Sequence, residues 1–256
     1  MENKALVEEQ NKNANIDNYK IDIHFARKDE GNISTLRRVI AFVIGLIGLV
    51  AISIIVQIIV LGFVSDKNSI TAFTTFGTYG VLFIVFVLFF LKDFKQFFKQ
   101  FLDIDVILRG VLIGVFLMGI PSVYLSFVNL FMDFGINSNE ASIREMAVQY
   151  PLLIIIFAGL LGPICEEFTY RVGFFGAIKK QNKVVAYIVT AIIFGLIHFD
   201  FETFANAEKL IIELVNLPAY MISGVILCYA FDRYGFAAAC VAHIFNNVVG
   251  LLGDII

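Results

Sequence analysis

The amino-acid sequence predicts an all-α fold, a polytopic transmembrane helical bundle of about seven spans with a site inside the membrane. Hydrophobic residues make up 59% of the 256 residues and charged residues 16%, which is outside the range of soluble domains. The apolar residues form long continuous runs, as membrane helices require, rather than the short alternating segments of a β-barrel. One run also carries Glu166, Glu167 and Arg171, and ionisable groups at membrane depth persist mainly where they pair or function.

The chain begins with a polar tail, residues 1–36, rich in Asn, Lys, Glu and Asp. Such a segment lacks the apolar surface that offsets the entropy of ordering, so we expect a disordered cytoplasmic tail with a solvated His24. This tail is a candidate binding site for a partner. Residues 37–256 are expected to form the transmembrane domain, and the first apolar run is too long for the h-region of a cleavable signal peptide.

Seven apolar segments follow the tail, and eight spans is the alternative count. We expect the spans at residues 39–64, 70–91, 106–131, 150–180, 184–199, 207–231 and 235–252. Residues 92–105 repeat phenylalanine at helical spacing opposite lysine, which predicts either a helix in the membrane interface or an extension of the second span. Residues 138–149 predict a short capped helix on the membrane surface.

Basic residues indicate the orientation of the bundle, because they collect in the tail and in residues 92–99 and 179–183. By the positive-inside rule, the N-terminus is cytoplasmic and seven crossings place the C-terminus outside. Residues 132–149 and 200–208 are then candidates for gating substrate access from the outer side. The net charge of −3 argues against a nucleic-acid partner, and membrane lipid is the expected one.

The cysteines, two isolated charged residues and a Gly/Pro cluster in the apolar runs are expected to have structural roles. The three cysteines are expected to be buried thiols rather than disulfides. Arg109 and Glu213 are expected to snorkel to the interface or to pair. Gly159, Gly162 and Pro163 precede the charged cluster, and they predict close helix approach and a local distortion that makes room for water.

Polar residues of three predicted spans fall at a common depth. At 1.5 Å per residue, Glu167 lies roughly 18 Å from the cytoplasmic end of its span and His198 roughly 22 Å. His243 lies roughly 12 Å in and Asn247 roughly 18 Å in on the same scale. Structural hydrogen bonding between helices explains any one of these residues, but the combination favours a hydrolytic centre.

Local spacing divides the two glutamates between different roles. Glu167 and Arg171 are four residues apart in the order that favours an ion pair within a helix. Glu166 is rotated by about 100° from Glu167, so it faces another neighbour and stays free to act as a general base. His243 and Asn247 are also four residues apart, so both can point at one spot.

Three motifs in this order resemble the CPBP family of intramembrane proteases, which includes CAAX proteases and bacteriocin-processing or Abi proteins. Glu166 to Arg171 resembles its EExxxR motif, Phe194 to His198 its FxxxH motif, and His243 to Asn247 its HxxxN motif. The resemblance covers residues 150–252, and the first three spans match only as generic membrane helices.

The resemblance implies an intramembrane endopeptidase, in a bacterial cell membrane, that cleaves a membrane-associated or lipidated peptide or protein. By this analogy Glu166 activates a water molecule, His198 positions it, and His243 with Asn247 stabilises the oxyanion. The residues that shape the site are Glu167, Arg171 and Phe194. In bacteria the family suggests peptide processing and bacteriocin immunity.

Metal dependence and two other functions remain open at this point. No cofactor is expected, but zinc bound by Glu166, His198 and His243 is the alternative, because this ligand set leaves a coordination position for water. A non-proteolytic scaffold that regulates another membrane or cell-envelope enzyme is the main alternative to a protease. An ion or proton transporter would also use intramembrane Glu and His, but the sequence shows no inverted repeat.

Overall fold

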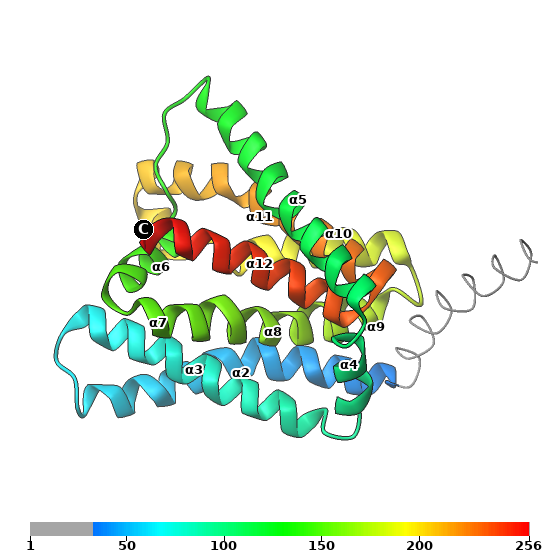
Figure 1. Cartoon of the computed structure of the whole chain (residues 1–256). Helices are drawn as coiled ribbons and strands as arrows, with labels where there is room; N and C mark the ends of the chain where they lie inside the picture. Colours follow the sequence, from blue (N-terminus) through cyan, green and yellow to red (C-terminus); the bar gives the residue numbers. More distant parts are fainter. Residues whose placement is uncertain (1–32, 256) are drawn as a thin grey trace, which may run out of the picture.

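The computed structural model describes residues 33–255, and all regular structure in that range is helical (Figure 1). Six of its helices are long and apolar enough to cross a membrane: α2 (Thr35–Leu61), α3 (Lys67–Phe89), α5 (Ile104–Asn129), the interrupted segment Pro151–Ile178, α11 (Ala207–Tyr234) and α12 (Phe236–Ile255). A shorter apolar helix, α10 (Lys183–Leu196), stands where the fifth span is predicted. The predicted all-α membrane bundle is therefore confirmed, and the chain is a multi-pass membrane protein. Most of the predicted tail, including His24, lies outside the described residues.

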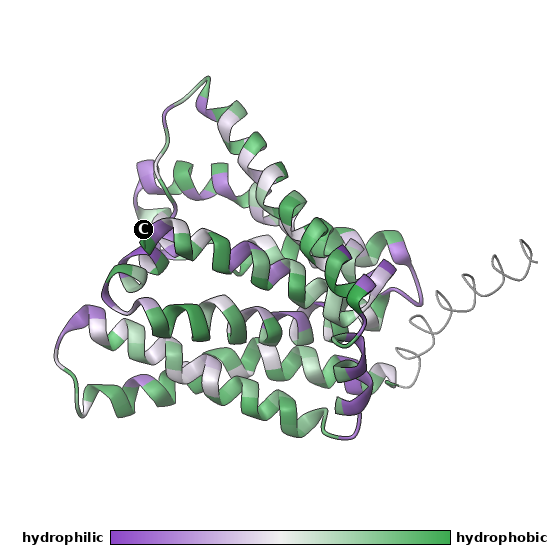
Figure 2. Ribbon diagram, viewed as in Figure 1, coloured by the Kyte–Doolittle hydropathy of each residue, from purple (hydrophilic) through white to green (hydrophobic). Residues whose placement is uncertain are grey.

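The hydropathy of the bundle matches a membrane environment. Hydrophilic residues gather towards the two ends of the bundle, and hydrophobic residues cover most of the length of the helices (Figure 2). Large apolar side chains such as Ile47, Ile58 and Leu88 are more than 60% exposed on the outer faces of α2 and α3. Such a surface is stable in lipid and not in water. The three cysteines are buried and free, as predicted.

The segment Pro151–Ile178 passes between α2 and α3 on one side and α12 on the other (Figure 1). It alternates between α-helix and π-helix: α7 (Pro151–Ile154), η2 (Ile155–Leu161), α8 (Gly162–Glu166), η3 (Glu167–Phe175) and α9 (Gly176–Ile178). The Gly162 N–H donates to the Phe157 carbonyl five residues earlier, and the next residue, Pro163, has no N–H to continue the pattern. The expected distortion before the charged cluster is thus present as a π-helical turn.

Helix α2 packs closely against η3 because a glycine faces it. A Cβ atom on Gly45 would lie 1.9 Å from Thr169 Oγ1 and 2.6 Å from Thr169 Cβ. A Cβ at this position would force Thr169 to move, so glycine permits the close approach of the two helices.

A separate helix, α4 (Phe94–Gln100), follows a turn after α3, so the alternative of an extended second span is wrong. Phe97 is 4% exposed and packs with Phe90, Phe168 and Phe236. Phe94 and Phe98 stack on each other on the exposed side. This division between one buried and one exposed phenylalanine face agrees with an interfacial helix.

Helix α10 is shorter than predicted, because the chain turns at His198 instead of continuing as helix. Its 14 residues extend about 21 Å, less than the roughly 30 Å of a bilayer core. The turn leads through η4 (Phe201–Ala205) into α11. Glu213 of α11, 2% exposed, accepts hydrogen bonds from the backbone N–H groups of Asp200 (3.3 Å) and Ser138 (2.9 Å). Pairing, rather than snorkelling, therefore accounts for this buried carboxylate.

Two further predictions concern the short helix before the fourth span and Arg109 near the start of α5. Helix α6 (Ser138–Gln149) matches the predicted short helix, and Asn137 caps it by accepting a hydrogen bond from the Glu140 N–H. Arg109 forms a surface ion pair with Asp105 at 2.5 Å and lies over the Tyr234 ring. Pairing thus also accounts for Arg109.

Candidate active site

A cavity of about 560 Å³ lies among α2, α3, α6, α8, α11 and α12, with the end of α10 also contributing to its wall. Its lining includes Glu166, Phe194, His198, His243 and Asn247. Segments far apart in the sequence thus bring five of the predicted residues to one space, and His198, His243 and Asn247 are the three of them that the depth comparison included. The other two, Glu167 and Arg171, are fully buried behind this lining.

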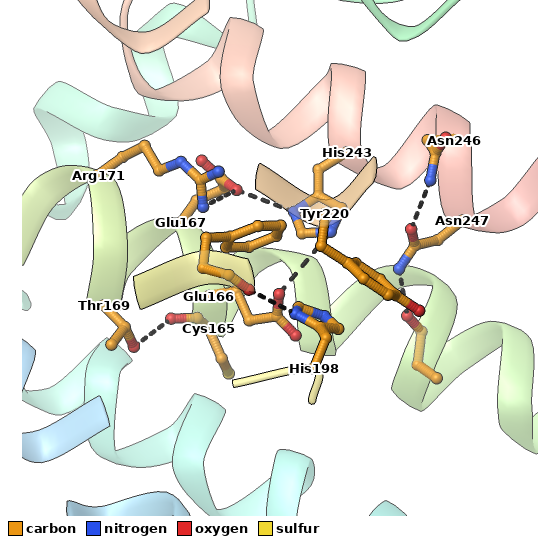
Figure 3. A network of polar contacts seen from close by, with 12 residues as sticks. Cys165, Glu166, Glu167, Thr169, Arg171, His198, Tyr220, His243, Asn246 and Asn247 are labelled. Atoms are coloured by element: carbon orange, nitrogen blue, oxygen red, sulfur yellow. Dashed lines mark hydrogen bonds and ion pairs between the residues drawn. The ribbon is translucent and has the colours of Figure 1, made fainter. Parts of the chain in front are cut away.

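Glu166 lines the cavity, and its carboxylate lies beside the His243 ring (Figure 3). Its Oε1 accepts a hydrogen bond of 3.2 Å from the hydroxyl of Tyr79 on α3. Its Oε2 lies 3.8 Å from His243 Nε2 and forms no hydrogen bond with any other described residue. One oxygen is therefore anchored by a phenol, while the other is buried beside an imidazole without a hydrogen-bond partner among the described residues.

Glu167 joins Arg171 to His243 (Figure 3). Its Oε1 lies 3.1 Å from Arg171 Nη1, as the helical spacing predicted, and 2.8 Å from His243 Nδ1, which the spacing did not predict. Glu167 and Arg171 are both 0% exposed, and the guanidinium of Arg171 also lies 4.4 Å from the centre of the Phe194 ring. Because Nδ1 is bound to Glu167, the His243 ring turns Nε2 towards Glu166.

His198 lies on the turn after α10 and is held on two sides. Its Nδ1 lies 2.8 Å from the Phe194 carbonyl oxygen, which fixes the ring and leaves Nε2 for other partners. Its ring stacks on the Tyr220 ring, with centroids 4.4 Å apart and 14° between the planes. The Tyr220 hydroxyl accepts hydrogen bonds from the side chains of Asn137 and Asn139, so the start of α6 is linked to His198.

Asn247 of α12 bridges to the distorted segment. Its side-chain N–H donates to the Ala158 carbonyl at 3.2 Å, and its Oδ1 accepts from Asn246 at 3.1 Å. Ala158 precedes Pro163 by five residues, so its carbonyl lacks the π-helical donor that a non-proline residue would supply. Asn247 satisfies this carbonyl with one N–H and keeps a second one.

Sequence reasoning missed three residues of this site: Tyr79, Tyr220 and Asn246. Asn246 lay inside a recognised motif without a role. Tyr79 belongs to a polar stretch of α3, with Thr74, Thr75 and Thr78, that also lines the cavity. A run of hydroxyl side chains within an apolar helix was the signal that could have identified α3 as part of the site.

Two imidazoles and one carboxylate face the cavity, which is a donor set that metals use. Each imidazole also has its Nδ1 engaged, by Phe194 O or by Glu167, as is usual for metal ligands. Nevertheless, within residues 33–255 no three His, Cys, Asp or Glu side chains are grouped closely enough to hold a metal ion. The arrangement does not fit a bound metal as it stands.

Comparison with known proteins finds a family model that resembles this region. Residues 148–249 match the family model described as "Type II CAAX prenyl endopeptidase Rce1-like". The matched residues contain all three motifs, so the family resemblance is confirmed.

Curated relatives agree with the family match. YdiL of Bacillus subtilis, a candidate membrane peptidase by its name, is 32% identical over 99 residues, which are 37% of this chain and 38% of the relative. The "Membrane-embedded CAAX protease MroQ" of Staphylococcus aureus is 28% identical over 152 residues, 55% of this chain and 56% of the relative. An uncharacterized protein of Mycoplasma capricolum is 25% identical over 149 residues, 55% of this chain and 41% of the relative. The chain thus spans between about two fifths and just over half of these relatives, and no solved structure matches it.

Proposed function

Since residues 148–249 match the Rce1-like CAAX endopeptidases, we propose that this chain is an intramembrane endopeptidase. The observation that carries the proposal is the convergence of Glu166, His198, His243 and Asn247, from separate segments, on one cavity. A carboxylate with one oxygen that has no hydrogen-bond partner in the described part of the chain, beside an imidazole inside a helical bundle, is suited to general-base catalysis.

In the proposed reaction a water molecule adds to the carbonyl carbon of a peptide bond. Glu166 Oε2 takes a proton from the water as the new C–O bond forms, and the carbonyl oxygen becomes an oxyanion. His198 Nε2 holds the water, because Nδ1 is bound to the Phe194 carbonyl. His243 Nε2–H and the second N–H of Asn247 donate to the oxyanion, because donors held in place before the reaction stabilise developing negative charge.

The intermediate collapses when the C–N bond breaks. Protonated Glu166 returns its proton to the leaving nitrogen, which releases an amine and a carboxylic acid product. Glu167 supports this chemistry from behind, since its negative charge at Nδ1 balances the charge of a His243 ring that carries protons on both nitrogens. Arg171 and Phe194 in turn hold Glu167 and His198 in position.

The shape of the cavity suggests how substrate reaches it. Its lining extends from Glu166 to Asn139 and Glu140 at the start of α6 and to Asp254 near the end of α12. These residues lie at the end of the bundle opposite α4 and α9 (Figure 1). The basic connections lie at the α4 and α9 end, with the start of α2, so the positive-inside rule supports a cytoplasmic N-terminus and substrate access from the outer end.

The substrate we propose is a membrane-associated or lipidated peptide or protein, processed in a bacterial cell membrane. The name of MroQ, a membrane-embedded CAAX protease, supports a protease of this type in the membrane. A role in bacteriocin immunity would follow if the cleaved peptide were a bacteriocin. A partner that binds the N-terminal tail remains a prediction.

Cleavage of internally quenched peptides in proteoliposomes tests the proposal. The probes are one peptide with a farnesylated cysteine and one membrane-spanning peptide without a lipid. Wild type is expected to cleave at least one of them, while Glu166→Gln and His198→Ala lose roughly 100-fold to 10,000-fold in rate, the usual effect of losing acid–base catalysis. Glu145→Gln, an exposed change outside the cavity lining, serves as the control with unchanged rate.

Equal cleavage by wild type and Glu166→Gln would refute the proposed mechanism. If no probe is cleaved and a Glu166→Gln strain keeps the cellular function that a deletion strain loses, the chain acts as a scaffold instead. Metal analysis of the purified protein addresses zinc: stoichiometric zinc that disappears in His198→Ala and His243→Ala would require a metal-dependent mechanism.

A further inference from the structure

Helix α3 lies outside the family match, which begins at residue 148, yet it contributes a side chain that touches Glu166. The Tyr79 hydroxyl donates to Glu166 Oε1 at 3.2 Å, and Tyr79 also lines the cavity. It is the only described residue that donates a hydrogen bond to the Glu166 carboxylate. Glu166 is therefore oriented by a helix that the three motifs do not include.

The position of Tyr79 is set by close contacts between α3 and α8. A Cβ atom on Gly162 would lie 3.4 Å from two atoms of the Tyr79 ring, so the ring lies directly across this glycine. The thiol of Cys165, one residue before Glu166, donates to the Tyr79 carbonyl oxygen at 3.9 Å. Side chain and backbone of Tyr79 are thus both in contact with the segment that carries the carboxylate.

We infer that Tyr79 is a positioning residue for Glu166 in peptide hydrolysis. Tyr79 holds Oε1, and this fixes Oε2 as the oxygen that accepts the proton of the attacking water. The inference rests on the proposed function and deepens it, since it assigns separate tasks to the two oxygens of one carboxylate.

The chemistry of the two adjacent glutamates supports this assignment. Glu167 is held by the cation of Arg171 at 3.1 Å, which compensates its charge and suits a structural role. Glu166 Oε1 is held by a neutral phenol, which orients the carboxylate without placing a cation on that oxygen. A group that must accept a proton during the reaction needs orientation without a permanent counter-charge.

The test compares Tyr79→Phe with Tyr187→Phe, using the two quenched peptides described above. Tyr187 donates to Asp232 at 3.3 Å and does not line the cavity, so it is a matched control for removing one hydroxyl. Tyr79→Phe is expected to lower kcat about 10-fold to 100-fold with KM within about twofold, the effect of losing a hydrogen bond to a charged group. Tyr187→Phe is expected to keep kcat and KM.

Two further variants distinguish positioning from a structural effect. Tyr79→4-aminophenylalanine keeps a donor at the same place and is expected to recover most of kcat relative to Tyr79→Phe. Glu166→Asp shortens the side chain and moves the carboxylate away from the hydroxyl. In this background Tyr79→Phe is therefore expected to cause less than a twofold further loss, because the two changes remove the same interaction.

The outcomes separate this inference from the proposed function. If wild type cleaves a probe and Glu166→Gln does not, while Tyr79→Phe retains full kcat, the inference about Tyr79 is wrong and the proposed function stands. An increase in KM alone, or an equal loss in the Glu166→Asp background, would also overturn it. If Glu166→Gln cleaves like wild type, the proposed function itself fails.

Discussion

The ion pair between Glu167 and Arg171 permits a quantitative prediction, because both side chains are 0% exposed. Replacing Arg171 by Met removes the cation and leaves the Glu167 carboxylate buried with His243 as its remaining partner. Removing one member of a buried pair costs about 3–5 kcal/mol, since the other charge stays desolvated. The lost contact between the guanidinium and the Phe194 ring, at 4.4 Å, acts in the same direction.

Arg109→Met is the matched control for this prediction. Arg109 also forms an ion pair four residues away, with Asp105, but the two side chains are 36% and 65% exposed. Exposed pairs of this kind contribute about 1 kcal/mol or less, because water screens the charges. The two Arg→Met changes should therefore differ by at least about 2 kcal/mol in the free energy of unfolding.

Reversible unfolding in mixed micelles, followed by circular dichroism, measures both variants. Adding Glu167→Gln to Arg171→Met removes the unpaired charge and should recover part of the lost stability, which a double-mutant cycle detects as non-additivity. The reasoning is refuted if Arg171→Met is no less stable than Arg109→Met. It is also refuted if the effects of Glu167→Gln and Arg171→Met simply add.

Two other predictions concern the packing around the cavity. Gly45→Ala should cost about 1–3 kcal/mol of unfolding free energy, because its Cβ would overlap Thr169. The control Gly48→Ala meets only ordinary contacts at 3.7 Å or more and should be neutral or slightly stabilising. Equal stability of the two variants in the same unfolding assay would contradict this. Glu213→Gln should cost about 1–3 kcal/mol, because an amide offers only one acceptor oxygen to the two backbone N–H groups that Glu213 binds. In Glu213→Gln, hydrogen exchange should be faster at the amides of Ser138 and Asp200 than in wild type. Glu208→Gln is the control on the same helix, and unchanged exchange in Glu213→Gln would rule out this anchoring role.

The sequence alone determined the membrane bundle and the placement of most of its helices. Long apolar runs leave a chain in lipid little choice but helix, because every backbone N–H and C=O must be paired within the segment. Local spacing also determined the ion pair between Glu167 and Arg171, and the order of the motifs predicted the family resemblance that residues 148–249 show. Helix rise was enough to predict that Glu167, His198, His243 and Asn247 lie at a similar depth.

Only the tertiary structure decided which atoms meet at that depth. The hydrogen bond from Tyr79 to Glu166, the contact of Glu167 with His243 and the stacking of Tyr220 on His198 depend on how each helix is rotated about its axis. The π-helical turns before and after Glu166 shift that rotation, and a spacing rule based on regular α-helix does not include them. The end of α10 at Leu196 was likewise not predictable, because Glu213, the buried acceptor that stabilises the turn after it, comes from another helix. Residue spacing along a helix determines depth in the membrane, but contacts between helices determine the direction in which each side chain points.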